Sequence, residues 1–373
     1  MVNSRYHLPA GGTSLLNKHI TTLDGFRGLA ILLVTGYHYF HFFNAGWVGV
    51  DLFFVLSGFL ITGKLIESVT DKHYFRTFYL KRILRIVPLY FTVLLLFFWL
   101  LPLAWPSYVS ASMHELLQQQ VYYWSFTANF YDAVHGWPVN ISLIHCWSLC
   151  CEMQFYLLWP FVVYFFYSKG RQINFVFVIL IATGILFRIC AASFFSLSSV
   201  YRYVLLPCRL DAFCAGALLY LLVQHGWLQR YKKSLLVLAL TILMVILVLT
   251  TVSGMPWHFS VDGVSTYGYT LNAAGWACLL GFILTTQSGI GQAIFSSSLL
   301  TWFGKYSYGI YVFHLPVYIF TARLNIFNSG MTDKSWPLAA AAFAATCVCS
   351  LASYHLLEKY FLSLKPATVY AKD

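Results

Sequence analysis

Long apolar runs, each close to twenty residues, recur along the whole chain and are separated by short polar segments. An α-helix of about 20 residues spans the roughly 30 Å of a bilayer's hydrocarbon core. The runs are too long and too continuous for the alternating strands of a membrane barrel. The pattern therefore predicts an all-α, polytopic transmembrane bundle of about ten helices, at residues 26–43, 46–66, 86–105, 143–167, 173–195, 203–223, 234–253, 268–287, 306–326 and 337–361. Partial entry of segment 119–131 would make the count nine or eleven.

The composition agrees with this interpretation. Apolar residues make up 60% of the 373 positions and charged residues only 9%, whereas a soluble domain carries about 25% charged residues. We therefore expect residues 1–373 to form a single membrane domain with no soluble extracytoplasmic domain.

The basic residues indicate an orientation. If the N-terminus is cytoplasmic, most of the 23 Lys and Arg residues fall on the inner side, and segment 106–142 contains none of them. This asymmetry follows the positive-inside rule and predicts that both termini are cytoplasmic. Loop lysines and arginines also account for the net charge of +11, so we expect no nucleic acid partner.

Nine cysteines, an odd number, lie in or beside the apolar runs, and none has the spacing of zinc ligands. Buried Cys usually behaves as a small hydrophobic residue. We expect neither disulfides nor a metal site.

Ionisable residues inside a membrane are costly and tend to mark function. In the first span, Arg27 and His38 are eleven positions apart, which is about 1100° of helix rotation and close to three whole turns. They therefore share one helix face, with His38 roughly 16 Å deeper than Arg27; His41 adds a second imidazole. A neutral imidazole is the usual general base. The alternative is a packed histidine and an arginine that snorkels to the interface.

Several motifs occur in an order that resembles the acyltransferase family 3 membrane proteins. The opening resembles theirs in Leu23-Asp24-Gly25-Phe26-Arg27-Gly28, in the Arg-ten residues-His spacing to His38, and in the segment from Gly49 to Leu60. Further similar segments are Arg82-Ile83-Leu84-Arg85, His145-Cys146-Trp147-Ser148-Leu149 with Glu152, Arg209-Leu210-Asp211 with Gly216, Tyr306-Ser307-Tyr308 to His314, and Glu358. Together they cover nearly the whole chain.

Two features depart from the family pattern. The family commonly has two consecutive acidic residues in the fourth helix, and here Met153 follows Glu152. Some relatives also carry a hydrolase-like domain after the last helix, and we expect none here.

The resemblance implies transfer of an acyl group from acyl-CoA, with acetyl-CoA as the expected donor substrate and no permanently bound cofactor. Arginine forks suit the phosphates of CoA, and Arg82 and Arg85 are three apart on one helix face. Arg27, Arg82 and Arg85 are thus expected to bind the donor, and Arg27, His38 and Glu152 to act in catalysis. Alternatively, Arg82 and Arg85 anchor the chain on anionic membrane lipids.

Other polar residues are expected along a substrate path. His145, Ser148 and Glu152 share a helix face, so Glu152 is expected either to orient His38 or to pair with a cation such as Arg209. We expect Asp51 and Asp211 to be partners of Arg27 and Arg209, and His314 to be a second polar lining residue. Ser57 has no evident base and is interpreted as a helix-packing residue.

The outer segment 105–142 combines aromatic residues with Asn129, Asp132 and Asn140. Such a surface suits a sugar acceptor, although an interfacial aromatic belt has the same composition.

The function expected from the resemblance is O-acylation, most simply O-acetylation, of a hydroxyl on a surface polysaccharide such as lipopolysaccharide or on a lipid-linked glycan, in the bacterial cytoplasmic (inner) membrane. A transporter or flippase without covalent chemistry is the main alternative, but the two halves that inverted repeats would produce are not evident. A non-catalytic assembly subunit is a third possibility.

Overall fold

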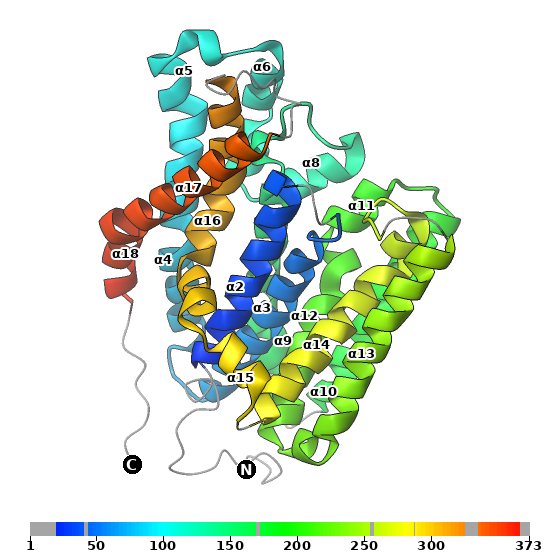
Figure 1. Ribbon diagram of the computed structural model, residues 1–373. Helices are drawn as coiled ribbons and strands as arrows, with labels where there is room; N and C mark the ends of the chain where they lie inside the picture. Colours follow the sequence, from blue (N-terminus) through cyan, green and yellow to red (C-terminus); the bar gives the residue numbers. More distant parts are fainter. Residues whose placement is uncertain are drawn as a thin grey trace.

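The computed structural model describes residues 20–40, 44–168, 172–253, 257–286, 288–324 and 335–365. Within these ranges the chain is helical, with short 3-10 and π turns and no strand, and the helices pack into one bundle (Figure 1). The all-α prediction is confirmed. His41 and the basic residues Arg5, Lys18, Lys169, Arg171, Lys334 and Lys372 lie outside the described residues.

The expected apolar runs all coincide with long helices. Their bounds are α2 (Ile20–Thr35) with the π turn η1 (Gly36–Phe40), α3 (Val48–Glu67), α4 (Tyr74–Leu95) with η2 (Leu96–Leu100) and α5 (Leu101–Ala104), α9 (Cys146–Tyr167), α10 (Ile173–Ser193), α12 (Leu206–Gln224), α13 (Trp227–Ser253), η5 (Val264–Gly268) with α14 (Tyr269–Thr285), α16 (Ser298–Arg323), and α17 (Trp336–Ser353) with η6 (Tyr354–Glu358) and α18 (Lys359–Ser363). Shorter elements are η3 (Pro106–Tyr108), α6 (Ala111–Gln118), α7 (Gln120–Trp124), α8 (Ala128–His135), η4 (Ile141–Leu143), α11 (Ser199–Val204) and α15 (Ile290–Phe295).

Eight of the helical stretches in the described ranges are long and apolar enough to cross a membrane. The other two expected spans are α2 with η1, and α16, which lie side by side in the bundle (Figure 1). These two helices carry Arg27, His38, Tyr311 and His314. They are thus less apolar than their neighbours and hold much of the chemistry that the sequence analysis singled out.

Small residues allow the central helices to approach closely. Gly28 of α2 lies against the backbone of α16, and Gly58 of α3 lies against that of α12. A Cβ atom at Gly58 would overlap the carbonyl oxygen of Phe213, and one at Gly216 would overlap that of Val55. Because lipid tails are as apolar as the helix surfaces, such close packing is a main source of association between membrane helices.

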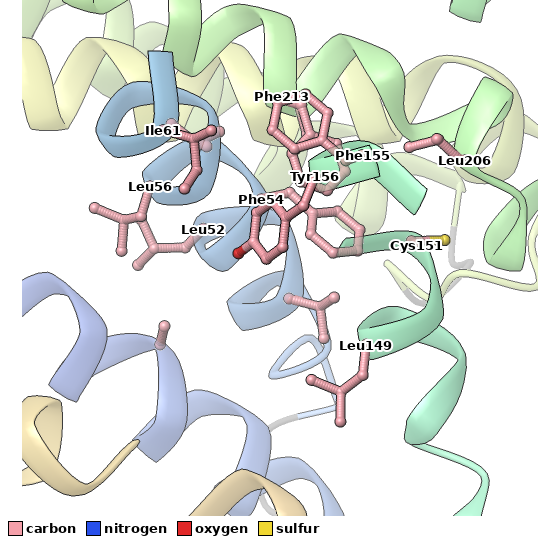
Figure 2. Packing of buried hydrophobic residues seen from close by; sticks show 14 of the residues in the cluster. Leu52, Phe54, Leu56, Ile61, Leu149, Cys151, Phe155, Tyr156, Leu206 and Phe213 are labelled. Carbon is pink, nitrogen blue, oxygen red and sulfur yellow. The ribbon is translucent and has the colours of Figure 1, made fainter. Parts of the chain in front are cut away.

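An aromatic stack connects α3, α9 and α12. The ring of Phe213 stacks on Phe54 with centroids 4.5 Å apart and on Phe155 at 4.2 Å. Figure 2 shows these rings together with Leu52, Leu149 and other buried side chains. The stack fixes the rotation of α9 relative to α3, which determines how Ser57 and Glu152 face each other.

Two buried ion pairs differ from the pairs expected from the sequence. Arg209 pairs with Asp51 rather than with Asp211, and all three side chains are almost completely buried. Asp211 instead pairs with Arg188 at 2.9 Å. The expected Asp51–Arg27 and Asp211–Arg209 pairs are therefore wrong, because helix packing brings α3 against α12, and α10 against α12.

Asp51 and Arg209 are further held by neutral groups. Asn272 of α14 donates its amide to Asp51 Oδ2 at 3.0 Å, and the Arg209 guanidinium lies 4.1 Å from the Tyr269 ring centroid. A buried pair surrounded in this way joins α3, α12 and α14.

Removing one partner of this pair should destabilise the protein more than removing both. Arg209→Met leaves the Asp51 carboxylate buried without its cation, and breaking a buried pair typically costs about 3–5 kcal/mol. We expect Arg209→Met and Asp51→Asn each to lower the thermal unfolding midpoint of the detergent-purified protein, and the double variant to recover part of the loss. Additive losses in the double variant would show that the two side chains are not coupled.

Candidate functional site

A cavity of about 260 Å³ lies between α2, α3, α4, α9 and α16. Its lining includes four basic side chains, from Arg27, Lys64, Arg82 and Arg85, and a single carboxylate, from Glu152. Hydroxyl and phenol groups and aliphatic side chains complete the lining. The cavity is thus polar and positively charged in the middle of an otherwise apolar bundle.

The three arginines predicted to act together line this same cavity. Arg27 donates to Asp24 at 2.6 Å, and the Arg82 guanidinium lies 5.6 Å from the ring centroids of both Phe78 and Tyr156. Among the described residues, neither Arg82 nor Arg85 forms an ion pair, and the buried Nε of Arg82 has no hydrogen-bond partner. In contrast, Arg188, Arg202 and Arg209 each pair with an aspartate.

Glu152 faces the arginines and a serine. Ser57 donates its hydroxyl to Glu152 Oε1 at 2.6 Å and lies 3.5 Å from the hydroxyl of Tyr156. Arg209, the cation proposed as a partner of Glu152, pairs with Asp51 instead. Ser57, interpreted from the sequence as a packing residue, is therefore part of the site.

His38 does not line the arginine cavity, although Arg27 does. The reason is local: residues Gly36–Phe40 form a π turn, which is wider than an α-helical turn, so positions after Gly36 leave the phase that the 3.6-residue period predicts. His38 Nδ1 donates to the carbonyl of Val34 at 3.0 Å. The expectation that Arg27 and His38 point into one cavity is wrong.

His38 instead joins two other histidines from different helices. The His314 ring, on α16, lies 5.0 Å from that of His38 and 4.7 Å from that of His145 between ring centroids. His145 immediately precedes α9, and both His145 and His314 are buried. We call His38, His145 and His314 the histidine trio.

Two hydroxyl groups separate the trio from the cavity. The hydroxyls of Ser148 and Tyr311 hydrogen-bond to each other, and each lies 3.2 Å from the carbonyl oxygen of His145, so that one donates to the carbonyl while the other donates to its neighbour. Both side chains line the cavity. The trio is therefore adjacent to the cavity and one layer of side chains away from it.

The fourth-helix prediction is correct for Ser148 and Glu152 but not for His145. Ser148 and Glu152 line the cavity, whereas the His145 ring contacts His314. His145 immediately precedes α9 and already has helical backbone angles, but its ring packs against His314 of α16.

Sequence reasoning missed several lining residues, namely Lys64, Tyr156, Tyr308 and Tyr311. Lys64 is seven positions after Ser57, and Tyr308 and Tyr311 are three apart on the helix of His314. Helical spacing from residues already chosen would have found them.

The polar residues of the outer segment face the protein interior. Asn129 exchanges hydrogen bonds with Gln154, and Asn129, Asp132 and Asn140 are buried. Burial raises the pKa of the Asp132 carboxyl to about 8. These three side chains are therefore not available to a sugar at the surface, contrary to the expectation.

Comparison with known proteins agrees with this architecture. The family model described as an acyltransferase domain matches residues 20–355. Peptidoglycan O-acetyltransferase OatA of Listeria monocytogenes is 25% identical over 363 residues, covering 93% of this chain and 56% of that protein. O-acetyltransferase OatA of Staphylococcus aureus is 25% identical over 316 residues, covering 81% and 51% respectively.

A shorter relative is an uncharacterized protein of Haemophilus influenzae, 33% identical over 162 residues. No solved structure was found to match the chain. The chain spans about half the length of the two O-acetyltransferases that it matches. Because the family model covers nearly all of the bundle, including the cavity and the histidine trio, the chain belongs to the acyltransferase 3 family of membrane proteins.

Proposed function

We propose that this protein is a membrane O-acetyltransferase that moves an acetyl group from acetyl-CoA to a hydroxyl of a cell-envelope glycan. The observation that carries the proposal is the cavity in which Arg27, Arg82, Arg85 and Lys64 meet in a chain of this family.

The proposal that acetyl-CoA binds in the cavity depends on the positive charge of arginines that have no carboxylate partner. Unpaired cations inside a membrane protein are costly, and two of the cavity arginines, Arg82 and Arg85, form no ion pair among the described residues, whereas Arg27 pairs with Asp24 and Lys64 with Glu67. A polyanionic ligand would offset that cost, and CoA supplies a pyrophosphate and a 3′-phosphate. The half-buried Arg82 and Arg85 are suited to bidentate phosphate contacts, while the thioester arm extends along the apolar part of the cavity.

The transfer step needs a base near the thioester. The carbon–sulfur bond breaks, an ester bond to the acceptor oxygen forms, and the hydroxyl proton ends on the sulfur of CoA. His38 either removes that proton or first accepts the acetyl group on its ring. Glu152, held by Ser57, acts on the donor side among the arginines.

The acceptor and the orientation belong to the same proposal. Both O-acetyltransferase relatives act as their names state, one of them on peptidoglycan, which favours peptidoglycan or a lipid-linked precursor of an envelope glycan over other acceptors. The arginine cavity would open to the cytoplasm, where acetyl-CoA is made, with both termini on that side of the inner membrane.

The direct test uses purified full-length protein in liposomes with acetyl-CoA inside and a soluble or lipid-linked glycan outside. We expect release of free CoA that depends on the acceptor, and a mass increase of one acetyl group on the glycan. Solute movement without CoA release would contradict the proposal.

Replacing the cavity arginines should weaken donor binding. Arg82→Gln and Arg85→Gln each remove a charge-assisted contact worth about 1.5–3 kcal/mol, so the KM for acetyl-CoA should rise about tenfold or more in each. The matched control is Arg76→Gln, an exposed arginine of the same helix α4, which should leave the KM unchanged. Equal effects of all three variants would favour lipid anchoring over donor binding.

Replacing His38 should abolish the chemistry and preserve the fold. In His38→Asn the amide can still donate to the Val34 carbonyl, but the side chain can no longer accept a proton. We expect kcat to fall by about 10²–10⁴-fold, measured as acceptor-dependent CoA release. His225→Asn is the control, because His225 makes the same kind of bond to the carbonyl four residues earlier. Full activity of His38→Asn would refute its assignment.

A further inference from the structure

The hydrogen bonds of the histidine trio fix which nitrogen of each ring carries the proton. Nδ1 of His38 contacts the carbonyl of Val34, Nδ1 of His314 that of Tyr311, and Nε2 of His145 that of Val312. Because a carbonyl only accepts hydrogen bonds, each of these nitrogens must donate. In the neutral rings the remaining nitrogens, Nε2 of His38, Nε2 of His314 and Nδ1 of His145, are therefore proton acceptors.

Two of those acceptors lack a donor. His314 Nε2 and His145 Nδ1 are buried and have no hydrogen-bond partner among the described residues, although their rings lie 4.7 Å apart. Buried polar groups are nearly always paired, and an exception requires an explanation. Within the described part of the chain these side chains are not grouped so as to hold a metal ion. The missing partner that fits two adjacent ring acceptors is a proton or a proton-donating hydroxyl.

We propose that His314 and His145 receive the proton that His38 takes from the acceptor hydroxyl and pass it toward the donor cavity. This inference rests on the proposed function, in the route in which His38 acts as the general base. His314 and His145 act through His38 and are positioning residues for its proton; neither needs to touch the acceptor.

Two hydroxyls lie between the trio and the cavity, and they bond to the backbone carbonyl of His145, not to the free nitrogens of His145 and His314. Tyr311 packs its ring against both His145 and His314, with centroids 5.5 and 5.4 Å apart, and its hydroxyl bonds to Ser148 at the cavity wall. In the proposed relay, a proton that leaves the histidine trio near Tyr311 moves toward the arginine cavity, where the thioester of the donor breaks. The step balances: the acceptor oxygen loses a proton as it forms the ester bond, and the CoA sulfur gains one as the thioester bond breaks.

Phenol groups and further imidazoles lie beside the trio in the described part of the chain. On η1, Tyr37 lies edge-on to His38 and hydrogen-bonds His258 of the loop before α14. Tyr39 donates to the carbonyl of His314. The charged groups that act on His145 and His314 are the other rings of the trio.

The test uses substitutions that keep each backbone hydrogen bond and remove only the ring's basic nitrogen. Asn at 314 reproduces the Nδ1 donor, and Gln at 145 reproduces the Nε2 donor. We expect His314→Asn and His145→Gln to lower kcat about tenfold or more with the KM for acetyl-CoA within twofold of the unmodified protein. The inflection of the kcat–pH profile should also move, which a purely structural role would not produce.

The unmodified protein supplies a second measurement that does not depend on how the variants fold. Rates in mixtures of H₂O and D₂O should curve with deuterium content, because more than one proton moves in the rate-limiting step. A straight dependence, or folded variants with unchanged kcat and pH profile, would overturn the relay.

Failure of the relay and failure of the proposed function are distinguishable. If His38→Asn is inactive while His314→Asn and His145→Gln are unaffected, the relay is wrong and the acyltransferase proposal stands. If the unmodified protein releases no CoA in the presence of acceptor, the proposed function itself is wrong. His225→Asn again serves as the matched control and should leave both kcat and the pH profile unchanged.

Discussion

Every polar or charged side chain inside a membrane bundle must find a partner in the protein or in a ligand, because lipid offers none. In this protein the arginines divide on that basis. Arg188, Arg202 and Arg209 are paired with aspartates and connect helices. Arg82 and Arg85 have no carboxylate within ion-pair distance among the described residues, and they line a cavity. The first group connects helices of the bundle, and the second lines the place where the proposed polyanionic donor would bind.

The same constraint connects the two halves of the proposed reaction. The arginine cavity and the histidine trio occupy neighbouring layers, separated by the hydroxyls of Ser148 and Tyr311. The proposed base thus lies one side-chain layer away from the arginines proposed to hold the phosphates of the donor. An enzyme that takes its donor from one face of a membrane and its acceptor from the other needs such an arrangement, since an open aqueous passage would leak and would hydrolyse the thioester.

The candidate site could be predicted from the sequence only in part. Spacing along one helix correctly placed Arg82 beside Arg85 and Ser148 beside Glu152. It failed for Arg27 and His38 because a π turn intervenes, and for His145 because its ring packs against His314 of another helix. The predicted ion pairs between helices were also wrong, because Asp51 pairs with Arg209 and Asp211 pairs with Arg188. The helical period predicts which residues of one helix share a face. The rotation of one helix relative to another depends instead on how their surfaces pack.

By itself the sequence determined that this is a polytopic helical membrane protein, because twenty-residue apolar runs have one stable conformation in lipid. It also determined which titratable residues are candidates, since each one within an apolar run is costly and therefore informative. Only the tertiary structure decided which of them meet. The approach of α2 to α16 and of α3 to α12 through glycines, and the aromatic stack that orients α9, brought four cations to one cavity and three imidazoles to one cluster. Those contacts join residues distant in sequence, and no local pattern specifies them.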